Sequence, residues 1–206
     1  MSKDNENVDN VAAVSVSPPP PTPPKKANIG RRTRWSARQL ATMALLTALS
    51  TAFAFFQIPL GLSTLSYDPS NLPGIIGALA YGPIAGTLII IIGQALHGIF
   101  TADFIGAAMN IVLGIAYILP TALICRKNKT TKRLIIGLVI GSLVSFALCI
   151  PSNFVAWSVY AGIEPAAVAA MILPFILPFN SIKIVLNSIL SFLLYKSLHR
   201  FLEPAE

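Results

Sequence analysis

Long apolar runs, separated by short polar segments, constrain the fold of this sequence more than any other feature. The runs extend over about Leu40 to Leu60, Leu72 to about Tyr81, about Ile84 to Phe100, Phe104 to Ile124, Leu134 to about Tyr160, and about Ala166 to Leu202. A helix needs about 20 apolar residues to cross a bilayer. Only 11% of the residues are charged, against about 25% in soluble domains. We therefore predict an all-α integral membrane protein with a six-transmembrane-helix bundle.

The boundary between the second and third runs leaves two alternatives open. Tyr81, Gly82 and Pro83 interrupt the apolar pattern, and we interpret them as a tight turn between a short helix and a longer one. The alternative is a single long kinked helix, because membrane helices tolerate Gly and Pro.

The charges between the runs predict the orientation of the chain. Basic residues gather before the first run, in the loop Arg126–Arg133, and at the C-terminal Lys196 and Arg200, whereas the alternate loops carry Asp68, Asp103 and Glu164 and no Lys or Arg. With six crossings every basic segment falls on one side, and the positive-inside rule makes that side cytoplasmic. We expect both termini in the cytoplasm of a bacterial cell, with the chain crossing its membrane. The net charge of +7 is thus explained by topology, with no nucleic-acid partner.

The first 34 residues differ in composition from the rest. They are polar and then rich in proline, and such a segment buries too little apolar surface to fold. We predict a disordered, Pro-rich cytoplasmic tail over 1–34 and a six-helix membrane substrate-binding domain over 35–206.

Several polar side chains fall inside the apolar runs. Lys183 lies midway along the last run, where an ammonium costs about 2.5–3.5 kcal/mol. Asn180 precedes it by three positions, on the same helix face, and Asn110 and Asn153 are amides in two other runs. The alternatives are a lysine that reaches the membrane surface and amides that only join helices. Four such groups favour a polar substrate-binding pocket inside an apolar bundle.

Gln94 and His97 share a face of the third helix and are further candidates for this pocket, although a single His is more often a packing residue. The sequence contains no His pair with zinc spacing, no Ser/His/Asp set and no Gly-rich phosphate loop. We therefore expect no catalytic residues, no metal and no cofactor of the chain's own.

Ala44, Ala48 and Ala52 repeat at four-residue spacing in the first helix. Small residues on one face let another helix approach closely. That helix belongs either to the chain's own bundle or to a partner subunit.

Several motifs resemble those of one family. They are Tyr67-Asp68-Pro69-Ser70-Asn71-Leu72-Pro73, Tyr81-Gly82-Pro83 with Gly86, Met109-Asn110 with Gly114, Asn153-Phe154-Val155, and Pro178-Phe179-Asn180-Ser181-Ile182-Lys183 followed by Leu194-Tyr195-Lys196. From about Trp35 to Leu202 the chain resembles the substrate-binding S component of energy-coupling factor (ECF) vitamin transporters, and most of all the riboflavin-specific group.

The resemblance implies a mechanism. An S component binds its vitamin from outside, under a lid between its first two helices, which here would be Leu62 to Asn71 with Leu65, Tyr67 and Asp68. It then docks through the alanine face of its first helix on a transmembrane coupling subunit driven by two ATPase subunits, which use the ATP. Asn153, Asn180 and Lys183 match positions associated with flavin binding, and the ribityl hydroxyls would use the amides and Lys183.

The sequence also departs from the riboflavin-type pattern. Ile90 and Gly93 stand where an acidic residue and a lysine are often found, Ala107 replaces an acidic residue, and Asn71 replaces the second acidic residue of the lid segment. Riboflavin is the expected ligand, and S components for cobalamin, pantothenate or a queuosine precursor are the alternatives. An intramembrane enzyme or a stand-alone secondary transporter is the alternative of another class.

Overall fold

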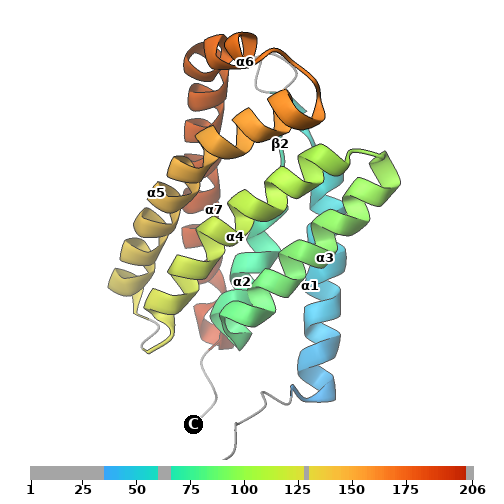
Figure 1. Cartoon of the computed structure of the whole chain (residues 1–206). Helices are drawn as coiled ribbons and strands as arrows, with labels where there is room; N and C mark the ends of the chain where they lie inside the picture. The colour runs from blue at the N-terminus through green and yellow to red at the C-terminus, as the bar shows by residue number, and fades with distance from the viewer. Residues whose placement is uncertain (1–34, 60–65, 128–129, 203–206) are drawn as a thin grey trace, which may run out of the picture. The chain divides into compact units, whose positions relative to one another are not determined.

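The computed structural model describes residues 35–59, 66–127 and 130–202, and the side chains of 198–202 are outside that description. The elements, in chain order, are α1 (Ala37–Phe55), β1 (Ile58–Pro59), β2 (Ser66–Tyr67), α2 (Asn71–Tyr81), α3 (Pro83–Thr101), α4 (Phe104–Cys125), α5 (Thr131–Val155), the π-helical η1 (Ala156–Tyr160), α6 (Pro165–Met171), the π-helical η2 (Ile172–Ile176) and α7 (Leu177–Leu202). The predicted tail, 1–34, and the lid residue Leu65 lie outside the described residues. The mainly helical architecture agrees with the predicted fold class (Figure 1).

The first helix begins at a capping box and ends earlier than predicted. The Ser36 hydroxyl accepts from the Gln39 N–H, and the Gln39 side chain accepts from the Ser36 N–H. The helix stops at Phe55, and Ile58–Pro59 pairs antiparallel with Ser66–Tyr67. Pro59 disfavours a helical conformation at the residue before it. The apolar run to Leu60 therefore contributes one strand of a short hairpin instead of another helical turn.

The break between α2 and α3 confirms two separate helices. Gly82 adopts φ 102°, a conformation that glycine adopts without the steric penalty of a side chain. Pro83 then occupies the first turn of α3, where its missing N–H leaves no hydrogen bond unmade. The alternative of one kinked helix is wrong.

The short helix α2 lies in the interior of the bundle. It contacts α1, α3, α4 and α7, and most of its residues are buried. At Gly86 of α3 an added Cβ would meet the Gly74 carbonyl oxygen at 2.6 Å, so the two helices pack with their backbones close together. Ile75, Ile90 and Ile118 belong to the core cluster around α2. Burial of α2 fixes the position of the segment that precedes it.

Proline residues reshape the last two predicted helices. The fifth continues through Pro151 and becomes π-helical at Ala156–Tyr160. The sixth divides into α6, the π-helical η2 with Pro174, and α7 with Pro178. A proline removes one backbone donor and displaces the preceding turn, and π-helical turns are frequent at functional sites. Figure 1 shows α6 at the end of the bundle where β2 also lies.

Four helical stretches of the described chain are long and apolar enough to cross a membrane. They are Pro83–Thr101, Phe104–Cys125, Thr131–Tyr160 and Pro165–Ser197. The helix α2 has 11 residues, about 16 Å at 1.5 Å per residue, which is about half of the hydrocarbon thickness. Large apolar side chains such as Leu45, Leu143 and Val159 are exposed on the outside of the helices, as lipid contact requires.

Candidate functional site

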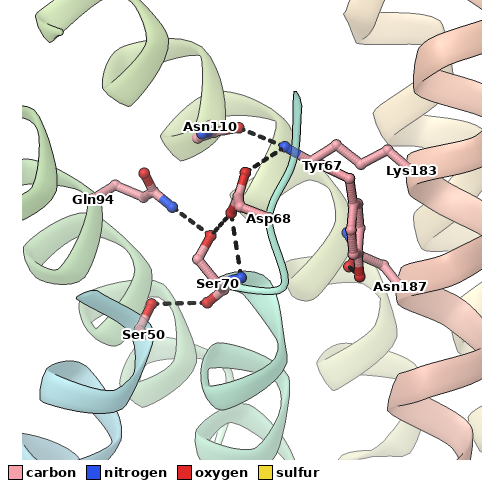
Figure 2. A network of polar contacts seen from close by, with 8 residues as sticks. All are labelled: Ser50, Tyr67, Asp68, Ser70, Gln94, Asn110, Lys183 and Asn187. Carbon is pink, nitrogen blue, oxygen red and sulfur yellow. Dashed lines mark hydrogen bonds and ion pairs between the residues drawn. The ribbon is translucent and has the colours of Figure 1, made fainter. Parts of the chain in front are cut away.

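Lys183 of α7 forms the centre of a buried polar network. Its Nζ donates to Asp68 Oδ2 at 3.0 Å and to Asn110 Oδ1 at 2.9 Å, and the residue is 9% exposed. Figure 2 shows the side chain reaching from α7 toward both partners. The prediction that Lys183 faces a polar interior agrees with this geometry, and the alternative of a lysine reaching the membrane surface does not. An ammonium has three donors, so one N–H has no partner among the described residues.

Asp68 belongs to the turn between β2 and α2, and that turn is held from three helices. Its Oδ1 accepts from the backbone N–H and the hydroxyl of Ser70. The Ser70 hydroxyl in turn accepts from Gln94 Nε2 at 2.6 Å, and the Ser70 carbonyl accepts from Ser50 Oγ at 2.8 Å. Bonds from α1, α3 and α7 thus converge on two residues (Figure 2). The segment is a fixed part of the site.

Opposing effects set the ionisation of Asp68. Burial raises the pKa of a carboxyl group, but the Lys183 ammonium and the Ser70 donors outweigh it, so the pKa of Asp68 lies below its ordinary value. Asp68 is therefore a carboxylate at neutral pH and forms an ion pair with Lys183.

A cavity of about 320 Å³ adjoins this network. Its lining residues come from α1, the hairpin, α3, α4, α5, η1 and α7: Ala54, Gln57, Ser66, Asp68, His97, Asp103, Ile105, Gly106, Met109, Asn110, Leu113, Asn153, Trp157, Ala161, Phe179, Asn180 and Lys183. Small-molecule sites are typically about 300–1,000 Å³, mostly apolar, with a few placed polar groups. The rings of Trp157 and Phe179, the amides on α4, α5 and α7, and the Lys183 ammonium fit that description.

The amides of Asn153 and Asn180 each have one free acceptor. Asn153 Nδ2 donates to the Cys149 carbonyl at 2.8 Å, and Asn180 Nδ2 donates to the Ile176 carbonyl at 2.9 Å. Both residues are buried, and no described residue donates to either Oδ1. These backbone bonds fix the orientation of two carbonyl oxygens in the wall of the cavity.

The two candidate residues on α3, His97 and Gln94, occupy different environments. His97 lines the cavity, with its ring edge-on to Phe55 at 5.0 Å between centroids. Gln94 is fully buried and lies outside the lining, where it supports Ser70. The structure therefore places Gln94 behind the site.

Tyr67 of the predicted lid is also turned inward. Its hydroxyl donates to Asn187 Oδ1 at 2.9 Å, and the ring is 3% exposed. Burial and the neighbouring Asp68 raise the pKa of Tyr67 to about 12, so the phenol is a neutral donor. Tyr67 fastens the hairpin to α7 and does not line the cavity, whereas Asp68 does.

Comparisons with known proteins agree with this architecture. The family model of the ECF transporter substrate-specific component matches residues 38–195. The chain belongs to the S components of ECF transporters. The alternative of an intramembrane enzyme is therefore wrong, because this family consists of transporter components that bind substrates.

Two riboflavin transporters and one solved S component are similar to this chain. The riboflavin transporter RibU of Staphylococcus aureus (strain TCH60) is 31% identical over 175 residues, which cover 81% of this chain and 93% of that protein. The riboflavin transporter FmnP of Bacillus subtilis (strain 168) is 26% identical over 181 residues, covering 81% and 94%. A solved S component of a bacterial ECF transporter superposes with a TM-score of 0.69 at 27% identity, covering 81% of this chain and 98% of that one.

The alanine face of the S component is exposed. Ala44, Ala48 and Ala52 are all exposed, whereas Met43, Thr51 and Ala54 of the same helix are buried. Within the described chain, no helix covers these three alanines. The face is open to lipid or to a partner helix.

Sequence reasoning missed some cavity residues. Trp157 follows Asn153 by four positions, so helical spacing alone predicts a shared face. Phe179 adjoins Asn180, and Asp103 caps α4 by accepting from the Gly106 N–H at 2.8 Å.

Proposed function

We propose that this S component captures riboflavin from outside the cell for ATP-driven uptake. Support comes from two relatives that are riboflavin transporters and from the chemistry of the cavity. Trp157 and Phe179 suit a flat aromatic ligand. A free acceptor on Asn153 or Asn180 suits the single N–H at the polar edge of the isoalloxazine ring, and the remaining N–H of Lys183 suits a neighbouring ring carbonyl.

The observation that carries the proposal is the buried Lys183 ammonium at the cavity wall. Asp68 neutralises its charge and Asn110 fixes its position. The group thus offers a placed donor to an uncharged ligand, and its own charge is already paired.

The topology forms part of the same proposal. Four described stretches are long and apolar enough to span. The helix α1, and the short α2 together with the segment that precedes it, would complete six crossings with both termini in the cytoplasm. The acidic loops would then face outward, on the side of the cavity. The site would open toward the outside of the bacterial cell membrane.

The energy source belongs to partner subunits. The exposed face of Ala44, Ala48 and Ala52 would contact a transmembrane coupling subunit, and two ATPase subunits would hydrolyse ATP. Close approach of a partner helix requires small side chains such as these. The S component itself would use no cofactor.

Tryptophan fluorescence tests the proposal directly. The chain has two tryptophans, and Trp35 lies outside the cavity lining. In the Trp35→Phe variant all indole emission comes from Trp157, and micromolar riboflavin should quench it. The Trp157→Phe variant, which retains Trp35 at the other end of α1 from the lining residue Ala54, is the matched control and should show weaker quenching at saturation.

Absence of quenching and of binding at micromolar riboflavin would contradict the vitamin assignment. Cobalamin, pantothenate and a queuosine precursor would then be screened by thermal shift. A ligand at one hundred times its Kd stabilises a protein by about 2.7 kcal/mol, which such a screen detects.

A further inference from the structure

Three buried polar atoms on one face of α3 have no hydrogen-bond partner in the described chain. They are His97 Nδ1, His97 Nε2 and Gln94 Oε1. His97 is 4% exposed and Gln94 is 0% exposed. Buried polar groups are nearly always paired, because an unpaired one loses its hydrogen bonds to water without replacement. Their occurrence within one helical turn, beside a cavity, indicates an occupant that supplies the missing partners.

The network around Ser70 fixes which end of Gln94 is free. The Ser70 hydroxyl donates its hydrogen to Asp68 Oδ1, so it accepts at its other side. Gln94 Nε2 is the donor that satisfies it, and the carbonyl oxygen of Gln94 is therefore the unpaired end. Gln94 lies outside the cavity lining, so a ligand in the cavity reaches this oxygen only through a bridging water.

His97 requires both a donor and an acceptor from its partners. A neutral imidazole presents one N–H donor and one acceptor nitrogen. The polar edge of the isoalloxazine ring has a single N–H between two carbonyl groups, whereas every hydroxyl group both donates and accepts. Neighbouring hydroxyl groups therefore satisfy an imidazole and a nearby carbonyl oxygen better than a heterocyclic edge does.

The two sides of the cavity thus differ in chemistry. Asn153 and Asn180, on α5 and α7, offer two oriented acceptors beside the Lys183 donor, and His97, on α3, offers one donor and one acceptor. We propose that His97, supported by Gln94, is the subsite that recognises the polyhydroxyl side chain of the ligand. This inference rests on the proposed binding of riboflavin, and it moves the ribityl hydroxyls from the amides to α3.

The subsite is tested by comparing a flavin without the ribityl chain with riboflavin, in wild type and in a variant without the imidazole. Lumiflavin carries the isoalloxazine ring with a methyl group in place of the ribityl chain. The His97→Phe substitution keeps an aromatic ring against Phe55 and removes both nitrogens. Its Kd for riboflavin should rise about 5- to 25-fold, as expected for one or two neutral hydrogen bonds, while its Kd for lumiflavin should change less than about twofold.

Two controls separate a contact from a general loss of fold. Asn153→Leu should weaken both flavins by a similar factor, because it alters the wall assigned to the ring. His97→Gln retains a donor and an acceptor and should recover part of the preference for riboflavin. Wild-type protein should itself bind riboflavin more tightly than lumiflavin, and that comparison needs no variant.

The outcomes distinguish this inference from the proposed function. Tight binding of both flavins with equal Kd, or an equal loss of both in His97→Phe, overturns the subsite and leaves riboflavin capture intact. An unchanged riboflavin Kd in His97→Phe shows that water alone pairs with the imidazole, which also overturns it. Binding of neither flavin by the wild-type protein overturns both proposals.

Discussion

Replacing Lys183 by methionine separates its two assigned roles, in stability and in ligand binding. The substitution keeps an unbranched side chain of similar length and removes the ammonium. It leaves the Asp68 carboxylate, 5% exposed, without its partner at 3.0 Å. Breaking a buried ion pair from one side costs about 3–5 kcal/mol. At about 2–4 °C per kcal/mol for a chain of this size, Tm of the ligand-free protein should fall by roughly 6–20 °C.

The double variant Asp68→Asn with Lys183→Met removes the unpaired charge. Its Tm should return close to the wild-type value, because neither member of the pair is then charged. Riboflavin affinity should stay low in both variants. A hydrogen bond from a charged donor contributes about 1.5–3 kcal/mol, which predicts a Kd about 10- to 150-fold higher.

The assays are thermal unfolding without ligand and riboflavin titration followed by Trp157 emission. Lys196→Met is the matched control, since Lys196 lies on the same helix and is exposed, and it should change neither quantity. A Lys183→Met variant as stable as wild type would refute the structural role of the ion pair. A double variant with wild-type riboflavin affinity would refute the contact between the ammonium and the ligand.

Three further predictions follow from the same geometry. The pKa of folded Asp68 lies below its ordinary value. The ion pair therefore stabilises the fold above the unfolded pKa of about 3.9, and this contribution is lost as pH falls through the folded pKa. Tm measured against pH should drop more steeply below about pH 4 in wild type than in the double variant, and parallel curves would contradict the assignment. Ala48→Leu should reduce copurification of the ATPase subunits and riboflavin uptake while leaving the riboflavin Kd of the isolated chain unchanged, and normal copurification would remove the alanine face from the docking surface. The charged residues lining the cavity are Asp68, Asp103 and Lys183, and Asp103→Asn keeps the cap on α4. This variant should bind riboflavin 5′-phosphate about 5-fold more tightly at low salt, for a phosphate of about two charges at about 8 Å in water, and riboflavin with unchanged affinity. Glu164→Gln is the control, and an equal gain for both ligands would exclude an electrostatic cause.

Local signals in the sequence were sufficient for much of the helical pattern. Gly82 and Pro83 predicted the break between α2 and α3, because a positive φ and a proline in the first turn are backbone properties of single residues. Lys183 and Asn180 predicted a polar face on the last helix, because helical spacing places them together.

Long-range geometry was not accessible in the same way. Asp68 and Lys183 are 115 residues apart in sequence, and only packing of α2 inside the bundle brings the lid segment to α7. The π-helical turn η1, which contains Trp157, interrupts the regular helical pattern, and Phe179 enters the cavity wall from α7 beside Asn180. Gln94 and His97 share a face, but their different environments depend on where Ser70 and the cavity lie.

A structure of the riboflavin-saturated protein tests the central claim most directly. The account predicts the isoalloxazine ring against Trp157 and Phe179, with its polar edge within hydrogen-bond distance of Asn153, Asn180 and the Lys183 Nζ. A flavin bound elsewhere, or a saturated protein in which the ring makes no contact with Lys183, would contradict it.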